Sequence, residues 1–203
     1  MGDILGGAYD RLISQPRARV LAERLSSHLS TVTDVLDVGC GDGSVALRIK
    51  QRLPHLSIKG VDVLVLPHRK IDVERYDGKT LPCADKGFDA VLLVDMLHHT
   101  EDPLAMLREA RRVARKLVLI KDHTMDGLFA NATLRFMDWW PNRHNGVALS
   151  YNYWPERKWR DAFASLRMPI VAWESRIGLY PFPANLAFER HLQFIAALAP
   201  TVD

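Results

Sequence analysis

Residues 35–44 read Val-Leu-Asp-Val-Gly-Cys-Gly-Asp-Gly-Ser. An apolar strand expected at 34–38 runs here into a loop with glycine at Gly39, Gly41 and Gly43. Glycine adopts backbone conformations that are barred to other residues, and it lets a ligand approach the backbone amides closely. We therefore expect this loop to bind a nucleotide or a nucleoside.

The spacing of the glycines separates this loop from dinucleotide-binding loops. Those loops place their third glycine three positions after the second, where this chain has Ser44. The pattern is instead Gly-x-Gly-x-Gly, followed by an apolar helix start at residues 45–49. This spacing argues against a nucleotide-binding oxidoreductase, which is one alternative function.

The loop and its surroundings resemble motif I of the class I S-adenosylmethionine (SAM) dependent methyltransferases. In that motif an acidic residue two positions before the first glycine ends the first strand, and Asp37 takes this place here. The resemblance covers about residues 17–122 and is to the methyltransferase type 11 group, which includes quinone-biosynthesis enzymes. It implies SAM as the cofactor and methyl transfer to a small-molecule acceptor by in-line displacement.

Aliphatic runs alternate with segments of helical period, which predicts an α/β fold. We expect a Rossmann-like, seven-stranded, mostly parallel sheet with helices on both faces and, as the resemblance implies, an antiparallel strand at the C-terminal edge. Strands are expected near 34–38, 57–61, 71–74, 88–94, 117–120, 169–175 and 191–197. Residues 1–203 are expected to form a single methyltransferase domain, with an N-terminal helical cap at 1–30 and an insertion at 123–154 that forms a substrate lid.

Composition places bounds on the class of protein. A length of 203 residues suits one domain. The two cysteines, Cys40 and Cys83, and the lack of an export signal favour a cytoplasmic protein, and no apolar run reaches the roughly 20 residues of a membrane span. The net charge of +3 is small, and no Asn-Pro-Pro-Tyr/Phe tetrad follows the fourth strand, so a nucleic-acid partner is disfavoured. A monomer or a homodimer is expected.

Residues at the carboxyl ends of the strands are the candidates for the cofactor site, because ligands of open α/β sheets bind there. Asp62 ends the second strand 19 residues after Gly43, near the offset of about 20 at which an acid binds ribose hydroxyls. The resemblance places Asp77 against the adenine amino group and Asp95 beside the amino-acid half. The predicted cofactor residues are Asp37, Gly39, Cys40, Gly41, Gly43, Asp62, Val63, Asp77, Gly78, Asp95, Met96 and His98.

Two histidines, His99 and His123, are candidate catalytic bases, because a histidine with a near-neutral pKa takes a proton from a hydroxyl group. The alternative is that no side-chain base is used, since the cofactor supplies the reactivity. The insertion supplies aromatic and polar groups that suit a flat organic acceptor. The predicted substrate-binding residues are Asp122, His123, Trp139, Trp140 and Tyr151, although the two tryptophans could equally pack the helix onto the sheet.

No pair of histidines or cysteines has metal-ligand spacing, and the adjacent His98 and His99 are expected to point apart, so no metal is expected. Two further functions stay open on the sequence. One is an RNA or protein methyltransferase, and the other is a non-catalytic SAM-binding or interaction module with the same fold.

Overall fold

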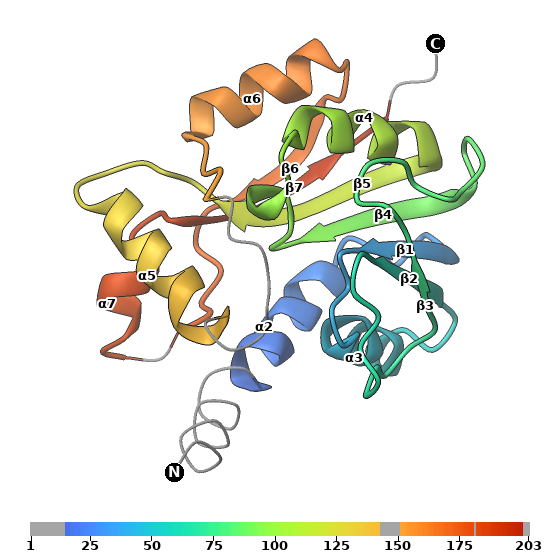
Figure 1. The fold of residues 1–203 in the computed structure, drawn as a ribbon, viewed down its shortest axis with the longest axis horizontal. Coiled ribbons are helices and arrows are strands. Elements are labelled where there is room, and N and C mark those ends of the chain that lie inside the picture. The colour runs from blue at the N-terminus through green and yellow to red at the C-terminus, as the bar shows by residue number, and fades with distance from the viewer. Residues whose placement is uncertain (1–14, 143–150, 181, 201–203) are drawn as a thin grey trace.

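The structure is a computed structural model, and it describes residues 15–142, 151–180 and 182–200. The described strands form one seven-stranded sheet in the order β3-β2-β1-β4-β5-β7-β6 (Figure 1). Their bounds are β1 Asp34–Val38, β2 Ser57–Asp62, β3 Val73–Arg75, β4 Phe88–Val94, β5 Ala114–His123, β6 Ile170–Glu174 and β7 Gln193–Leu198. Residues 1–14 of the expected cap and 143–150 of the expected lid lie outside the described residues.

Strands β1 to β5 pair in parallel, whereas β7 pairs antiparallel with β5 on one side and with β6 on the other. This confirms the predicted mostly parallel sheet with antiparallel pairing at the C-terminal edge. In sheets of this kind, ligands bind beyond the carboxyl ends of the strands, where the order of the strands reverses. That place lies here at β1 and β4.

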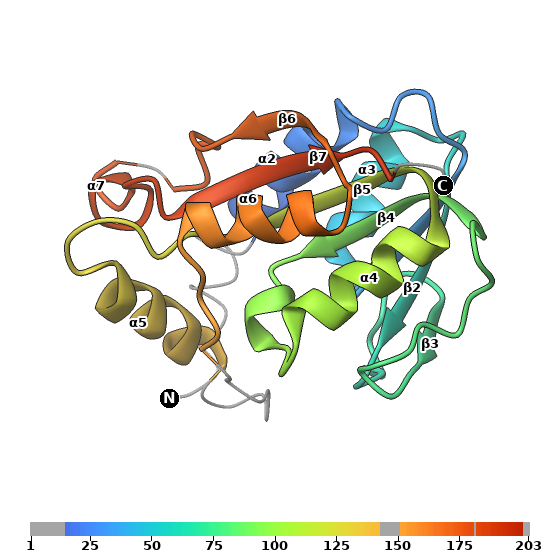
Figure 2. The same cartoon turned by 90° about the horizontal axis from the view of Figure 1, so that it is seen from above.

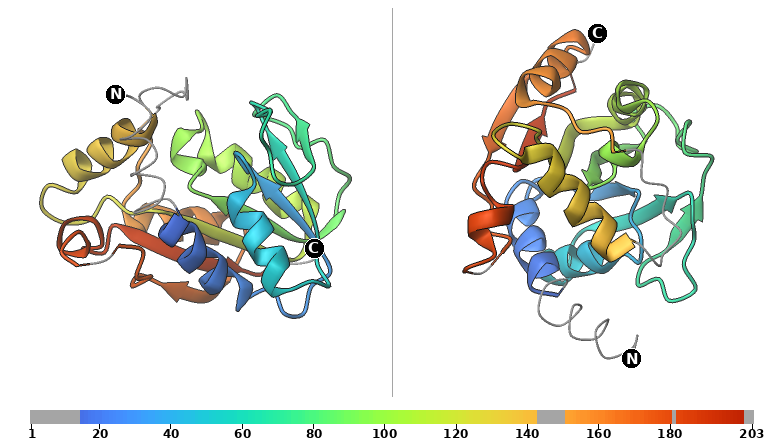
Figure 3. Two further views of the ribbon diagram at one scale, coloured as in Figure 1. Left: turned by 90° about the horizontal axis from the view of Figure 1, so that it is seen from below. Right: turned by 60° about the vertical axis from the view of Figure 1, so that its left-hand side comes forward.

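Helices cover both faces of the sheet, as expected (Figure 2). Helices α2 (Gln15–Ser26) and α3 (Ser44–Arg52) lie side by side on one face, and α4 (Pro103–Val113) and α6 (Glu156–Ser165) cover the other (Figure 3). The start of α4 is stabilised by its first residues. The Asp102 side chain accepts a hydrogen bond from the Ala105 amide, and Pro103 occupies the first turn, where its missing N–H costs nothing.

Strand β5 is longer than predicted. The sequence indicated a strand at 117–120, but β5 runs from Ala114 to His123 and begins directly at the end of α4. At its amino end β5 pairs with β4, with Phe88 opposite Ala114, and at its carboxyl end it pairs with β7 up to His123 opposite Gln193. The polar residues 121–123 are therefore strand residues. Lys121 pairs with both β4 and β7, whereas Asp122 and His123 pair with β7 alone, and the insertion begins only after them.

Three further elements lie beyond the carboxyl ends of β4 and β5 (Figure 1). They are η2 (Leu97–His99), a 3₁₀ turn, α5 (Ala130–Asn142), and α7 (Asn185–Phe188), which contacts α5. The sequence predicted α5 but neither of the other two. Across the described ranges, no helix has both the length and the apolar character that crossing a membrane requires.

Candidate cofactor and acceptor site

The three loop glycines have different surroundings. All three have positive φ, at 68° for Gly39, 57° for Gly41 and 74° for Gly43. A Cβ atom on Gly39 would lie 2.8 Å from the Cβ of Met96, and one on Gly43 would lie 2.6 Å from a carbon of Ile71, but one on Gly41 would meet nothing within 4 Å. Gly39 and Gly43 are therefore needed for packing inside the protein, whereas Gly41 leaves the backbone open to a ligand.

Asp62, at the end of β2, holds the loop. One of its oxygens accepts a hydrogen bond from the Gly41 amide at 2.8 Å, and the other accepts one from the Leu64 amide at 3.0 Å. A carboxylate has about four acceptor positions, so both oxygens keep capacity for a further donor such as a ribose hydroxyl group. The residue shapes the loop and remains available to a ligand.

The ends of β2 and β3 form a partly apolar wall next to Asp62. Val63 is half exposed, and a Cβ atom on Gly78 would lie 3.1 Å from its side chain. Asp77 is exposed and accepts hydrogen bonds from the amides of Thr80 and Lys79, which lower the pKa of its carboxyl group. The open backbone at Gly41, the acceptors on Asp62 and this wall suit the adenosyl group of SAM in shape and chemistry.

Asp37 lies beneath the loop and is almost fully buried. Burial, together with the negative charge of Asp62, raises the pKa of Asp37 to about 7. A cation held close by would favour the ionised form of this carboxyl group. Burial and the nearby carboxylates also raise the pKa of the Cys40 thiol, so the thiol stays protonated and packs against Gly60.

Asp95, directly after β4, joins three elements through charge. Arg17 of α2 and the fully buried Lys121 of β5 both form ion pairs with it. Burial acts to raise the pKa of Asp95, but the positive charges of Arg17 and Lys121 outweigh burial and lower it. Lys121 also donates to the side chain of Gln193 on β7. Arg17 could not be predicted as part of the site, because its partner Asp95 is 78 residues away in the chain.

His98 is buried between two carboxylates. Its Nδ1 donates to Asp122 Oδ1 at 2.6 Å, and its Nε2 lies 3.3 Å from Asp138 Oδ2 on α5. Burial disfavours the charged imidazole, but the two carboxylates outweigh burial and raise the pKa of His98 to about 10. The remaining contacts of Asp122 are to the backbone amides of Leu97 and His123. The side chain of Asp122 is 0% exposed, so it positions its neighbours, and its burial argues against the substrate contact predicted from sequence.

The prediction that His98 and His99 point apart is wrong. Their ring centroids are 4.1 Å apart and the rings are tilted by 47°, because both lie in the tight turn η2. His99 is only partly buried, and burial lowers its pKa. His123 is buried, and burial together with the charge of Lys121 lowers its pKa to about 3. A histidine that is neutral down to pH 3 is a weak proton acceptor, which argues against the predicted base role of His123.

Residues from the expected lid contact His98 and Asp138. The Tyr153 hydroxyl donates to the Asp138 carboxylate, and the Asn152 backbone N–H donates to the His98 carbonyl at 3.0 Å. The Arg135 guanidinium lies 4.2 Å from the centre of the Tyr151 ring. The Tyr153 ring lies 5.5 Å from the His98 ring and 6.3 Å from the Tyr151 ring, centroid to centroid, so Tyr151 is separated from the buried His98 by Tyr153, which the sequence analysis missed.

The two predicted tryptophans lie on α5. Trp139 is about half exposed, which is compatible with a rim position. Trp140 is in the helix, but its side chain lies outside the described part of the structure.

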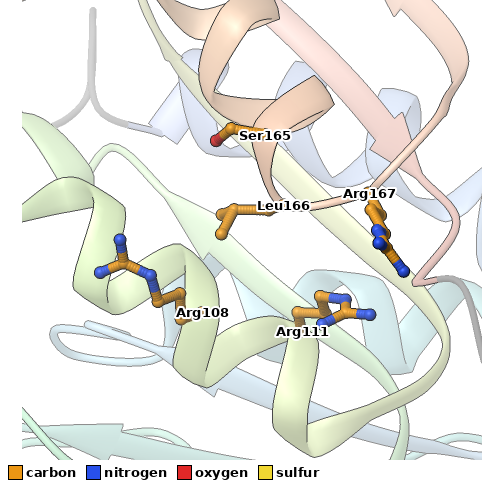
Figure 4. Close-up of a pocket in the computed structure, with 5 residues that line it drawn as sticks. All are labelled: Arg108, Arg111, Ser165, Leu166 and Arg167. Atoms are coloured by element: carbon orange, nitrogen blue, oxygen red, sulfur yellow. The ribbon is translucent and has the colours of Figure 1, made fainter. Parts of the chain in front are cut away.

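A cavity of about 400 Å³ lies elsewhere, between α4 and α6 (Figure 4). The residues that line it are Arg108, Arg111, Ser165, Leu166 and Arg167. They lie close to the amino ends of β5 and β6, and none belongs to the predicted site. The predicted cofactor and acceptor residues lie instead at the carboxyl ends of the strands, where ligands of such sheets bind.

Comparison with known proteins agrees with this arrangement. The sequence profile of the methyltransferase domain family matches residues 9–166, which is most of the chain. The chain belongs to this family. Its fold is that of the class I methyltransferases, and membership of a methyltransferase family argues against the oxidoreductase alternative.

Curated relatives match the chain over part of its length. A demethylmenaquinone methyltransferase of Thermotoga maritima is 33% identical over 89 residues, which cover 40% of this chain and 39% of that protein. A tRNA U34 carboxymethyltransferase of Nautilia profundicola is 32% identical over 89 residues, which cover 38% of this chain and 29% of that protein. The chain thus matches less than two fifths of the length of either relative.

A solved structure extends the likeness to the whole fold. The geranyl diphosphate methyltransferase in complex with SAM is 15% identical, with a TM-score of 0.68 over 90% of this chain and 85% of that chain. At this level of identity the comparison shows the fold alone.

Proposed function

We propose that this methyltransferase transfers the methyl group of SAM to a small organic acceptor. The acceptor would bind at the carboxyl ends of β4 and β5, between the glycine loop and α5. The observation that carries the proposal is the open backbone at Gly41, which lies at the same end of the sheet as the buried polar cluster of His98, Asp122 and Asp138.

The residues for the cofactor divide into two groups. Asp62, Val63, Asp77 and Gly78 would hold the adenosine half, through ribose hydroxyls, the adenine ring face and the adenine amino group. Gly41 would admit the methionine half, with the carboxylates of Asp37 and Asp95 close to its positive charges. When bound, SAM supplies a methyl group that is activated by a sulfonium leaving group.

The chain's own residues would supply orientation. In-line displacement needs the nucleophilic atom opposite the leaving sulfur, and holding two reactants in that geometry removes much of the barrier. Met96 packs on Gly39 and leads directly into η2, so the histidine cluster and the glycine loop keep a fixed relation. The acceptor would therefore lie within reach of His98, His99 and the α5 side chains.

One half-exposed aromatic side chain, Trp139, and one partly exposed side chain, Tyr151, support a small, flat acceptor. Trp139 and Tyr151 offer ring surface at this edge, as small-molecule pockets do. By their names, one relative acts on demethylmenaquinone and another on tRNA, and both match the chain at similar identity. RNA is therefore the second candidate acceptor, and the same assay must include it.

The experiment has two stages. Calorimetry with SAM and S-adenosylhomocysteine tests the cofactor site in the purified chain, and a lack of binding to both would refute the proposal. Release of S-adenosylhomocysteine is then measured with a panel of hydroquinones, phenols and prenyl diphosphates, and separately with tRNA. Turnover on a panel member supports the proposal. Turnover on tRNA alone would mean that the acceptor is RNA and not a small organic molecule. SAM binding without turnover on either would favour the non-catalytic module.

A further inference from the structure

The side chains of His98, His99 and Asp138 lie close enough together to share one ion. The ligand atoms that they offer all lie within 4.8 Å of one another. The two histidines come from η2, and Asp138 comes from α5, about forty residues later. We infer that these three residues form a binding site for a divalent transition-metal ion such as Zn²⁺, at the place where the acceptor would bind.

The geometry around His98 carries this inference. The His98 ring is 1% exposed, and its Nε2 makes no hydrogen bond within the described part of the chain, although Asp138 Oδ2 lies 3.3 Å away. A hydrogen bond between these atoms would be shorter, at about 2.8 Å. Two atoms that each bind one tetrahedral zinc ion at about 2.0–2.1 Å lie about 3.3 Å apart. The separation thus suits two ligands better than a donor and an acceptor.

The other nitrogen of His98 supports the same assignment. Nδ1 donates to the buried Asp122 at 2.6 Å. Metal-binding histidines usually donate their second ring nitrogen to a carboxylate, which fixes the ring and makes the free nitrogen more basic. Asp122 would be a positioning residue of this kind, held in turn by the Leu97 and His123 amides.

A second group of possible ligands, His98, Asp122 and His123, is less suitable. Its members are all buried, and Asp122 already accepts three hydrogen bonds. His123 Nδ1 faces the Leu192 carbonyl at 3.3 Å. In the first group His99 is only partly buried, which leaves an approach for an ion and open coordination positions for a substrate oxygen.

Two imidazoles and one carboxylate are ligands that suit zinc, iron or nickel. An ion with open positions binds a hydroxyl oxygen and lowers its pKa, so that the proton leaves to solvent more easily. This use rests on the proposed methyl transfer, whereas ion binding itself does not. Because a ligand cannot also accept the proton, the site would replace the base role predicted for His99.

The test uses the purified chain after treatment with a chelator. Titration with Co²⁺ should show one equivalent bound per chain, with visible absorption bands of a nitrogen- and oxygen-ligated ion. Competition with Zn²⁺ should remove these bands. We expect Asp138→Asn and His99→Ala to weaken Co²⁺ binding at least tenfold each. The exposed His55→Ala and His68→Ala are matched controls and should bind as the parent chain does.

Each result of these titrations either supports or overturns the proposed metal site. Less than stoichiometric binding, or unchanged binding in both site variants, overturns the metal site. Binding that falls equally in the two controls also overturns it, because the ion would then sit on surface histidines. If Asp138→Asn unfolds, as circular dichroism would show, His99→Ala alone decides. SAM calorimetry on the chelator-treated chain separates this inference from the proposed function, since the glycine loop contains none of these ligands.

Discussion

The two halves of the proposed site are built in different ways. The glycine edge, residues 39–43 with Asp62, is made of backbone, and its hydrogen bonds join segments that the parallel pairing of β1 and β2 already places together. The histidine edge, comprising His98, Asp122 and Asp138 with the neighbouring ion pair of Asp95 and Lys121, is made of side chains from η2, α5, β5 and the end of β4. The first half depends on leaving space open, and the second depends on neutralising buried charges.

This difference separates two kinds of failure. A substitution at the glycine edge can block a ligand while the protein stays folded. The reason is that Gly41 has no side chain, and a side chain added there would meet no protein atom within 4 Å of its Cβ. A substitution at the histidine edge removes a partner from a buried charge, which costs stability before it affects any ligand. The predictions below test this division.

The largest effect on stability is expected for Asp95→Asn. It would remove the negative charge that faces the buried ammonium group of Lys121. Leaving one partner of a buried pair uncompensated costs about 3–5 kcal/mol, so the free energy of unfolding in urea should fall by that amount. The double variant with Lys121→Met should recover part of the loss. A decrease below about 1 kcal/mol would show that the pair does not support the fold.

Gly41→Val should weaken SAM binding by about 100-fold or more, because a branched side chain would fill the open space at Gly41. Its positive φ adds a strain of about 1–2 kcal/mol, which the protein should survive. Gly39→Val is the matched control, since its side chain would strike Met96 and destabilise the fold. Calorimetry and thermal unfolding separate the two, and near-normal SAM affinity in Gly41→Val would mean that the ligand binds elsewhere.

Asp37 should make stability depend on pH. Its pKa is about 7 in the folded chain against an ordinary value of 3.8, so the folded state keeps a proton that the unfolded state has lost between these values. The contribution is complete below pH 4 and is lost as pH rises, with a decrease of about 2 kcal/mol between pH 5 and 7. Asp37→Asn should lack this slope when unfolding is measured at both values. Parallel slopes in the two proteins would contradict the raised pKa.

The smallest effect is expected for Arg52→Ala. Arg52 lies 3.2 Å from Glu23, and both side chains are exposed. Ion pairs of this kind contribute little, so the free energy of unfolding should change by less than about 0.5 kcal/mol. Arg52→Ala is the exposed reference for the buried ion pair at Asp95. If it lowered the free energy of unfolding as much as Asp95→Asn does, buried and exposed ion pairs would not differ in their contribution to stability.

The glycine edge could be predicted from the sequence because its contacts follow from strand order. Once 34–38 and 57–61 are identified as neighbouring parallel strands, Asp62 has to lie beside the glycine loop. The histidine edge could not be predicted in the same way. Asp138 and Tyr153 meet His98 only because α5 folds back over the ends of the strands, and no short-range pattern encodes that fold. The pairing of β5 with β7, which lengthens β5 to His123, is also set by residues about seventy positions away.

The long strand β5 has a consequence for changing the acceptor that the chain is proposed to bind. The backbone of its last three residues is held by pairing with β7, so their positions are fixed at the end of the sheet where an acceptor would bind. Diversity has to come from the segments that follow, around α5 and between β6 and β7. A chimaera that exchanges residues 125–155 for those of a relative should therefore change acceptor preference while SAM affinity is retained.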